Sequence, residues 1–306
     1  MTPSLAQPTG VWTALATPFI SNGEVDYASL PQLLEHQLQG GIQGLVVCGT
    51  TGEAPTLSTA EKIKLLQSIA DICAGQCQIM AGCGASSTTA TQEAASTLLE
   101  AGASTLLVVT PPYNKPSIAG LSEHFRTVRS TVGSTPICLY HVPGRTAQCL
   151  SAEELQQICI AADIQCIKEA SGNIELFSNT ARLLPQCSIL SGDDPTFLPS
   201  LSVGGSGVIS VVSHLYPTAV HKLMEAHHSG NHALALQIHH GLTPIIQALF
   251  CEPNPVPLKF ALQQKGLCGA NVRLPLAPLE QKSQTRICTA IKATDKALSA
   301  CIHTPL

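Results

Sequence analysis

Residues 164–172 read IQCIKEASG, an apolar run that ends in a lysine, a glutamate, an alanine and a Ser-Gly turn. β-Branched and apolar residues followed by turn-forming residues are typical of a short buried strand. Lysine is one of the residue types that are least often buried. Lys168, near the end of this strand, is therefore the first candidate for a side chain with a chemical role.

Apolar runs of this kind recur along the chain, and polar stretches separate them. The runs are nearly continuous rather than alternating, which is expected of parallel strands that are covered on both faces. Together with the run around Lys168 they number eight. They are Val11–Phe19, Gly44–Thr50, Gln78–Gly84, Thr105–Pro111, Pro136–Val142, Ile164–Ala170, Ser188–Asp193 and Gly207–Ser213.

The stretches between the runs carry helix signals. Asp26 is expected to cap one helix, because leucines with helical spacing follow it. Two more helices are expected to begin with a capping box, formed by Ser58 with Glu61 and by Ser151 with Glu154. Eight strands that are each followed by a helix predict an α/β fold, the (β/α)8 TIM barrel. A doubly wound sheet is the alternative, although it usually carries a Gly-rich dinucleotide fingerprint near its first strand, and none occurs there.

The strand pattern stops after about residue 226. We therefore predict a barrel domain over residues 1–226 and a small C-terminal helical appendage over residues 227–306. The proline-rich segment at 253–257 interrupts the helical pattern of this tail. The helical stretches are His232–Phe250, Leu258–Lys265 and Pro278–Ala300.

The composition excludes several classes of protein. Of the 306 residues, 44% are hydrophobic and 12% are charged, which suits a large core and not a disordered chain. The formal net charge is -4 and no basic block occurs, so we expect no nucleic acid as a partner. No signal peptide is recognisable, and no apolar run approaches the ~20 residues that cross a bilayer. We therefore expect a cytoplasmic protein without a membrane partner.

Thirteen cysteines and eleven histidines raise the question of a metal site. The cysteines are scattered, many of them inside apolar runs, and no CxxC motif occurs, so we expect reduced thiols that act as small core residues. Two histidine pairs, His227-His228 and His239-His240, lie in a histidine-rich stretch at 221–240. We expect partly exposed helical histidines there rather than metal ligands, and we predict no metal site.

In a TIM barrel the working residues lie at the C-terminal ends of the strands. Side chains alternate along a strand, so Lys168 and Glu169 cannot both point inward. If Lys168 faces the barrel axis, desolvation lowers its pKa and favours the neutral amine, which is the form that attacks a ketone. At an ordinary pKa only about one lysine in ~2,500 is neutral at pH 7. The alternative is a lysine that extends to solvent and pairs with a carboxylate.

Other strand ends supply groups that suit such an amine. Tyr113 and Tyr140 could carry protons, although tyrosines at these places could also be packing residues. Thr50 and Thr51 lie among glycines, and their hydroxyl and backbone N–H groups suit a carboxylate. Arg145, in a Pro-Gly turn, could hold a second carboxylate or simply lie at the surface. The glycines at 204–207 suggest a tight turn more than a phosphate site.

Five motifs together resemble the dihydrodipicolinate synthase branch of the pyruvate-dependent class I aldolases, the family that also includes N-acetylneuraminate lyase. They are GTTGE at 49–53, YHVPGRT at 140–146, IKEASGN at 167–173, SGDD at 191–194 and GVIS at 207–210. The resemblance implies condensation of pyruvate with L-aspartate 4-semialdehyde through a Schiff base, in lysine and diaminopimelate biosynthesis. It also implies a reaction without a metal or organic cofactor, in a homotetramer built from two tight dimers.

The resemblance also implies individual roles. Lys168 is the Schiff-base lysine, Tyr140 is its proton donor and acceptor, and Thr50 and Tyr113 complete the proton relay. Tyr113 is implied to reach into the site of the neighbouring subunit. Thr51 and Ile209 match pyruvate-binding positions, and Arg145 matches the residue that holds the carboxylate of the aldehyde. Gly192 is predicted to be a further substrate-binding residue.

Four positions depart from the pattern of relatives that are inhibited by lysine. Those relatives bind lysine with a histidine, an asparagine, a glutamate and a tyrosine, and the matching residues here are Lys62, Ser86, Ala90 and Pro112. Loss of the carboxylate and repulsion from Lys62 disfavour the lysine ammonium. We expect weak or absent inhibition by lysine. His141 stands where an asparagine is common.

Two other functions remain open at this point. A related aldolase would cleave a 2-keto-3-deoxy sugar acid, 4-hydroxy-2-oxoglutarate or N-acetylneuraminate with the same lysine. A non-catalytic barrel would only bind a carboxylate metabolite.

Overall fold

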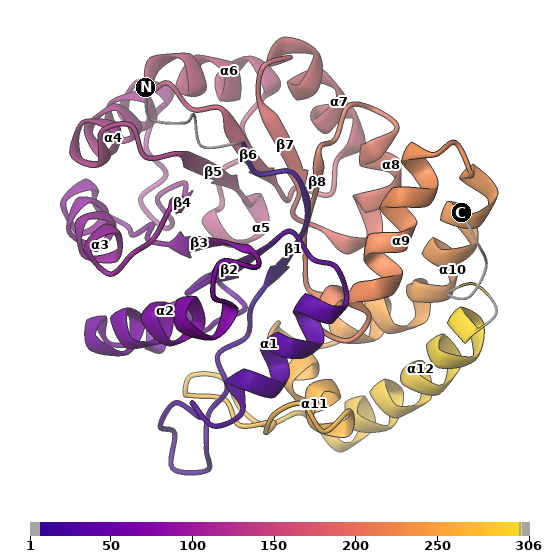
Figure 1. The fold of residues 1–306 in the computed structure, drawn as a ribbon. Coiled ribbons are helices and arrows are strands. Elements are labelled where there is room, and N and C mark those ends of the chain that lie inside the picture. The colour runs from indigo at the N-terminus through magenta and orange to yellow at the C-terminus, as the bar shows by residue number, and fades with distance from the viewer. Residues whose placement is uncertain (1–6, 300, 302–306) are drawn as a thin grey trace. The chain divides into compact units, whose positions relative to one another are not determined.

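The computed structural model describes residues 7–299 and 301, in which eight parallel strands close into a barrel in chain order (Figure 1). The predicted TIM barrel is confirmed, and each strand overlaps one of the eight predicted runs. Every strand ends before its apolar run does, because residues such as Leu15, Val142 and Val212 are buried in the loops beyond the ladder. The strands are β1 Gly10–Ala14, β2 Gly44–Val47, β3 Gln78–Gly82, β4 Thr105–Val109, β5 Ile137–His141, β6 Cys166–Glu169, β7 Ser188–Ser191 and β8 Gly207–Ser210.

The helices follow the strands as predicted. They are α1 Leu30–Gln39, α2 Thr59–Cys73, α3 Thr88–Glu100, α4 Ile118–Val132, α5 Pro143–Thr146, α6 Ala152–Ala161, α7 Ile174–Leu183, α8 Phe197–Leu201, α9 Pro217–His228, α10 His232–Leu249, α11 Val256–Gln264 and α12 Gln281–Ser299. Short 3-10 turns occur at η1 Ala54–Thr56, η2 Asp194–Thr196 and η3 Val212–His214.

The capping predictions are confirmed in two cases and wrong in one. Both capping boxes form, at the start of α2 and at the start of α6. Asp26 does not cap α1, whose N-cap is Ser29. The Asp26 carboxylate instead accepts hydrogen bonds from Ala28 N and Ser29 N, both 3.2 Å away, and so forms a turn before the helix. Asp26, three residues before the N-cap Ser29, therefore marks the turn that precedes α1 and not the start of the helix.

The chain divides into two compact units. The first unit consists of Met1–Gly10 and Ile79–Ile209, and the second of Val11–Gln78 and Ser210–Leu306. In the first unit the strands from β3 to β8 pair in parallel, and Gly207 explains the glycine-rich turn before β8. A Cβ on Gly207 would lie 2.0 Å from Gly10 O, so only glycine allows this close backbone approach.

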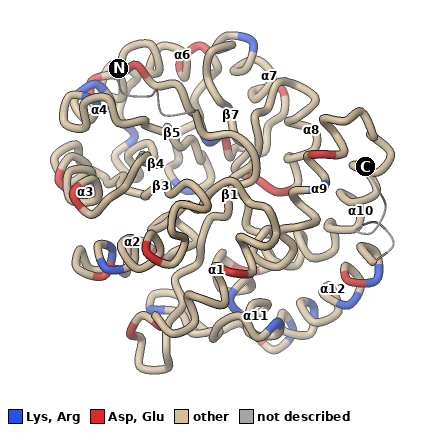
Figure 2. The backbone as a smooth tube through the Cα atoms, in the orientation of Figure 1, with Lys and Arg blue, Asp and Glu red and all other residues tan. Residues whose placement is uncertain are grey.

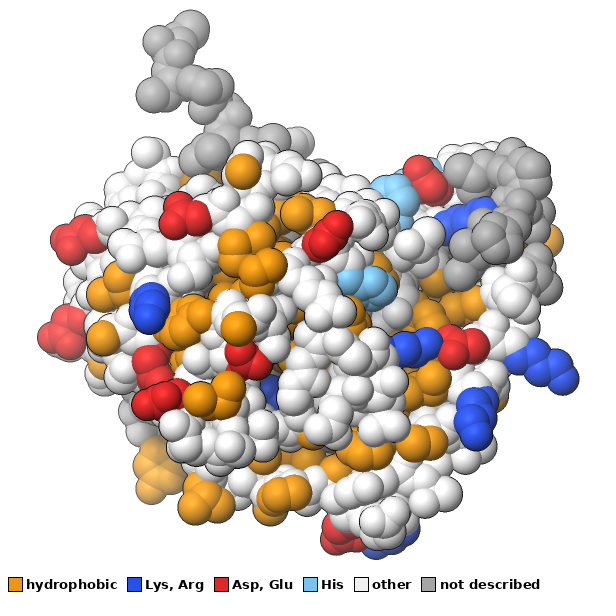
Figure 3. All heavy atoms as spheres, turned by 60° about the horizontal axis from the view of Figure 1, so that its bottom comes forward, with side chains coloured by type: hydrophobic (Ala, Val, Ile, Leu, Met, Phe, Trp, Pro, Cys, Tyr) orange, Lys and Arg blue, Asp and Glu red, His pale blue; other side chains and the backbone are white. Residues whose placement is uncertain are grey.

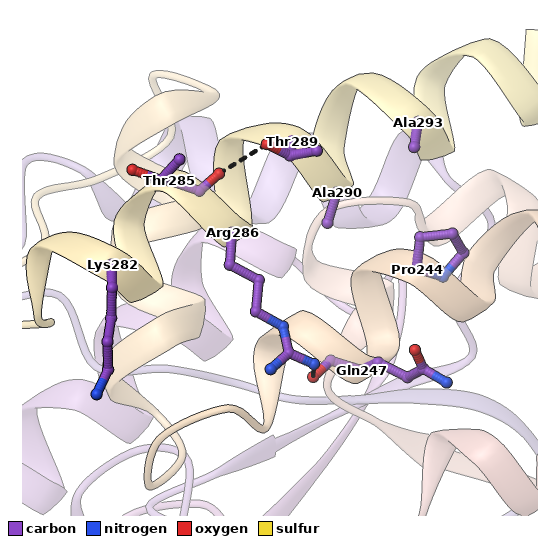
Figure 4. A pocket seen from close by; sticks show the side chains of 8 residues that line it. All are labelled: Pro244, Gln247, Lys282, Thr285, Arg286, Thr289, Ala290 and Ala293. Atoms are coloured by element: carbon purple, nitrogen blue, oxygen red, sulfur yellow. Dashed lines mark hydrogen bonds between the residues drawn. The ribbon is translucent and has the colours of Figure 1, made fainter.

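The second unit contains the β1–β2 pair and the C-terminal helices. The predicted tail helices are confirmed as α10, α11 and α12, and α12 packs along α10 (Figure 1). The domain division expected at residue 226 remains a prediction, because this unit includes residues from both sides of it. A groove of about 470 Å³ lies between α10 and α12 (Figure 4), where Arg286 donates a hydrogen bond to Gln247 O at 3.2 Å.

Charged residues are spread over the chain (Figure 2), and on the face drawn in Figure 3 their side chains lie singly or in small groups. The helix α12 is the most basic element, and beside Asp295 it carries Lys282, Arg286, Lys292 and Lys296. Among the described residues, no helix combines the length and apolarity needed to span a bilayer.

Candidate active site

Lys168 lies on β6, and its side chain is buried although its sequence position suggested that it could reach solvent. The residue is 6% exposed, so the alternative of a solvent-directed lysine is wrong. The register pairs Lys168 with Tyr140 on β5, and in a parallel pair such partners point to the same face. The Lys168 Nζ atom lies 4.3 Å from the centroid of the Tyr140 ring. The amine and the phenol predicted to work together are therefore neighbours in a largely dry environment.

Gly192 follows β7 and leaves the space that the lysine side chain occupies. A Cβ at this position would lie 2.8 Å from Lys168 Cε and 2.6 Å from Ala170 Cβ. Its amide donates to Glu169 O at 2.7 Å, which holds the loop against the end of β6. Any larger residue at 192 would therefore push the lysine side chain out of its position.

His141 and Glu169 directly follow Tyr140 and Lys168, and they point to the opposite face. His141 Nδ1 lies 3.0 Å from Glu169 Oε1, and both side chains are buried. No role for this pair was predicted, although the alternation of side chains along β6 already required Glu169 to face away from Lys168. A buried carboxylate needs a partner, and a histidine at the paired position of the neighbouring strand was the available signal.

Three more predicted residues belong to the same unit. Arg145 lies on the short helix α5, which follows β5, and its side chain is exposed. Ile209 is buried on β8. Tyr113 follows β4 in a left-handed conformation, with φ 76°, and is 88% exposed. A hydrogen bond from Asn114 N to Pro112 O at 2.9 Å closes a tight turn around Tyr113, and the tyrosine side chain does not pack into the core of this chain.

The carboxyl groups at the ends of β6 and β7 influence one another. The pKa of Asp193 is raised to about 6, chiefly by burial and further by the nearby Asp194 and Glu169. The charge at this end of β7 therefore changes near pH 6, within the range where enzymes are commonly assayed.

Thr50 and Thr51 belong to the second unit, in a tight loop after β2. The loop begins and ends at residues with left-handed backbones, Cys48 with φ 55° and Glu53 with φ 54°. Its turn is closed by hydrogen bonds from Gly52 N to Gly49 O at 3.1 Å and from Glu53 N to Thr50 O at 3.0 Å. Such strain is maintained only where the surrounding structure imposes it.

Two buried contacts from the C-terminal segment impose this loop conformation. Asn254 Nδ2 donates to Thr51 Oγ1 at 2.8 Å. Lys259, on α11, is completely buried and forms an ion pair with Glu53. Sequence reasoning missed Lys259, although it lies among apolar residues just as Lys168 does.

The comparisons with known proteins agree with this geometry. The sequence profile of the dihydrodipicolinate synthetase family matches residues 7–294. The chain belongs to the dihydrodipicolinate synthetase family. It is therefore an enzyme of the class I aldolase type, a lyase.

Named relatives cover nearly the whole chain. A 4-hydroxy-tetrahydrodipicolinate synthase of Cyanothece is 42% identical over 275 residues, which are 90% of this chain and 94% of the relative. The structure of the synthase from Methylacidiphilum fumariolicum SolV matches with a TM-score of 0.93 and 38% identity, over 97% and 99% of the two chains. The synthase of Acinetobacter baumannii, solved with pyruvate, matches with a TM-score of 0.90 and 33% identity, over 94% and 99%.

Residues 7–299 and 301 contain no group of three His, Cys, Asp or Glu side chains arranged to hold a metal ion. The histidine-rich stretch forms ring contacts instead, with the His227 centroid 5.8 Å from that of His228 and 5.3 Å from that of His232. His228 and His232 are exposed, as was expected of helical histidines at a surface.

Proposed function

We propose that this chain is a 4-hydroxy-tetrahydrodipicolinate synthase, which condenses pyruvate with L-aspartate 4-semialdehyde through a Schiff base on Lys168. The observation that carries the proposal is the buried Lys168 amine, 4.3 Å from the ring of Tyr140, in a member of the dihydrodipicolinate synthetase family. An amine kept from water and from carboxylates is suited to nucleophilic attack on a keto acid.

The first half of the proposed reaction makes a nucleophile from pyruvate. The neutral Lys168 amine attacks the keto carbon of pyruvate, and after Tyr140 gives a proton to the hydroxyl, loss of water leaves the protonated imine, an iminium. A methyl proton then passes to Tyr140, and its bonding pair forms the enamine as the iminium nitrogen takes up the C=N pair. Tyr140, whose ring centroid lies 4.3 Å from Lys168 Nζ, is proposed as the proton carrier in both steps. Burial supports this chemistry because it protects the imine from hydrolysis.

The second half joins the substrates. The enamine carbon attacks the aldehyde carbon of L-aspartate 4-semialdehyde, and the aldehyde oxygen takes a proton. The amine of the product then adds to the imine carbon and displaces Lys168, which closes a six-membered ring. We assign pyruvate binding to Thr51, Gly192 and Ile209.

We assign the carboxylate of the aldehyde to Arg145 because a guanidinium binds a carboxylate in bidentate fashion. The exposed position of Arg145 suits a substrate that arrives from solvent. Thr50 is proposed to join Tyr140 in the proton relay, since hydroxyl groups can pass a proton between neighbours.

Tyr113 is proposed to complete the relay of a neighbouring subunit within a homotetramer. Its 88% exposure supports this role, because a side chain that packs against a neighbouring subunit is exposed in a single chain. The scattered and mostly buried cysteines, among which no CxxC motif occurs, support the cytoplasm as the proposed place of reaction, where thiols stay reduced.

Mass spectrometry after incubation with pyruvate and borohydride tests the proposal. The wild type should gain a reduced pyruvate adduct on Lys168, and Lys168→Ala should gain none while remaining folded. A wild type that forms no adduct would exclude the Schiff-base mechanism and favour a barrel that only binds a carboxylate.

A coupled assay separates the synthase from related aldolases. Pyruvate is supplied with L-aspartate 4-semialdehyde or with the aldehyde that each sugar-acid lyase would release, and product formation is compared. The synthase assignment predicts the highest kcat/KM with L-aspartate 4-semialdehyde, whereas preference for a polyhydroxy aldehyde would assign the chain to the lyases.

A further inference from the structure

The buried pair His141–Glu169 lies between two parts of the proposed site. His141 follows Tyr140 on β5 and Glu169 follows Lys168 on β6, and the register places the two directly opposite each other. His141 is 0% exposed and Glu169 is 3% exposed. Neither side chain shares the face of Lys168, so neither can touch a substrate bound to it.

His141 links this pair to the loop that carries Arg145. The loop runs over residues 142–150, and Leu150 N donates a hydrogen bond to His141 Nε2 at 3.2 Å. Because Nε2 accepts this bond, the ring hydrogen resides on Nδ1, which donates to Glu169 Oε1 at 3.0 Å. The imidazole thus connects the far end of the loop to β6 with both of its nitrogens.

Glu169 extends the connection to the segment after the Schiff-base lysine. Its Oε1 also accepts a hydrogen bond from Ser171 N at 3.0 Å. The other bonds described inside the loop are local, such as Arg145 N to Val142 O at 2.9 Å, or lead away from β6, such as Gln148 Nε2 to Pro116 O at 2.9 Å. The route from Arg145 to Lys168 through side chains therefore runs through His141 and Glu169.

We propose that His141 and Glu169 are positioning residues that set the Arg145 loop relative to Lys168 and thereby set the affinity for the carboxylate-bearing aldehyde. This inference rests on the proposed function of Lys168 and Arg145. A loop displaced by about 1 Å can lower the rate about 100-fold, even when the change lies away from the chemistry. Pyruvate needs no contact with Arg145 under this assignment, so its binding should be nearly independent of the pair.

Steady-state kinetics of His141→Leu and Glu169→Gln test the inference. In both variants kcat/KM for the aldehyde should fall about 10- to 100-fold, mainly through KM, while borohydride trapping of pyruvate changes less than about threefold. The kcat/KM of His141→Asn for the aldehyde should lie much closer to that of the wild type than the value of His141→Leu does. The asparagine side chain carries an NH2 group that donates and a carbonyl oxygen that accepts hydrogen bonds, as the histidine ring both donates and accepts.

Hydrogen exchange gives a readout that does not depend on activity. The amide of Leu150 should exchange faster in His141→Leu than in the wild type, because its acceptor is gone. A matched control is His124→Leu, which removes another buried histidine of the first unit, bonded to Thr88 Oγ1 at 3.0 Å. The control should lower stability without raising KM for the aldehyde.

The outcomes distinguish a failure of the proposed function from a failure of the positioning role of His141 and Glu169. A wild type that forms no pyruvate adduct would defeat both the function and this inference. An active wild type whose folded His141→Leu and Glu169→Gln variants keep the KM for the aldehyde would defeat the inference alone. A loss confined to pyruvate trapping would also defeat it, since the pair would then act on Lys168 and not on the loop.

Discussion

Among the described residues two lysines are buried, and they differ in the groups that pair with their amines. Lys168 on β6 is 6% exposed, and Lys259 on α11 is 0% exposed. Each has an aromatic ring beside its amine, since Nζ lies 4.3 Å from the Tyr140 centroid in one case and 4.0 Å from the Phe19 centroid in the other. Lys259 also forms an ion pair with Glu53 and donates to Asn271 O at 2.9 Å. The ion pairs found among the described residues do not include Lys168.

The difference explains why one lysine is structural and the other is proposed to be reactive. Burial lowers the pKa of Lys259, but the Glu53 carboxylate acts in the opposite direction and favours the ammonium form. A paired ammonium has no lone pair to offer a ketone. Burial alone is therefore not a sign of a nucleophile, and burial without a carboxylate partner is the informative combination.

Replacing each lysine with methionine tests this comparison most directly. The largest effect is expected on the activity of Lys168→Met. Lys168→Met should lower kcat by at least about 10,000-fold, because the covalent intermediate cannot form. Its free energy of unfolding should stay within about 1 kcal/mol of the wild type or rise, since an unpaired buried amine is replaced by an apolar side chain of similar length. A large loss of stability, measured by urea unfolding, would mean that Lys168 is structural.

The reverse pattern is expected at the second lysine. Lys259→Met leaves the buried Glu53 carboxylate without its partner and should lower the free energy of unfolding by about 3–5 kcal/mol. The folded variant should still form the pyruvate adduct, because Lys168 is unchanged, but more slowly, because the Thr51 loop loses one of the two contacts that hold it. The double variant Lys259→Met, Glu53→Gln should regain part of the stability, and failure to do so would show that the charge pair is not the source of the loss.

A smaller effect is expected from the ion pair beside this one. Arg273 donates to Glu61 through Nη1 at 3.0 Å, and this contact lowers the pKa of Glu61 from 4.5 to about 2. A carboxylate whose pKa is lower in the folded state stabilises the fold above its unfolded pKa. That contribution is lost as the pH falls from about 4.5 toward 2. The free energy of unfolding should be measured at pH 5 and at pH 3. Since the pair is partly exposed, Glu61→Gln should reduce the difference between these two values by about 1 kcal/mol or less.

The smallest effect concerns a third lysine, which is partly exposed. Lys62 on α2 occupies a position where lysine-inhibited relatives are expected to carry a histidine, and a free lysine molecule brings a second positive charge to it. Millimolar L-lysine should therefore leave the rate of condensation nearly unchanged. Strong inhibition at sub-millimolar lysine in the steady-state assay would contradict this expectation.

Much of the fold could be predicted from the sequence, because the relevant signals are local. The eight apolar runs and the two capping boxes at Ser58 and Ser151 depend on neighbours within a few residues. Asp26 was misassigned because a residue that begins a turn and one that begins a helix offer the same carboxylate. The C-terminal ends of the strands were predicted too late in the sequence, because an apolar residue is buried as readily in a loop as in a hydrogen-bonded strand.

The sequence by itself determined that Lys168 and Tyr140 end strands of a parallel barrel, because strand periodicity and motif order can be read along one chain. The tertiary structure alone decided that the amine of Lys168 lies beside the Tyr140 ring while that of Lys259 meets Glu53. Both lysines stand in apolar segments of the sequence, so composition cannot distinguish them. The distinction depends on residues far away in the chain, since Glu53 and Lys259 come together only when the fold closes, and Coulomb attraction acts on distance in space rather than in sequence.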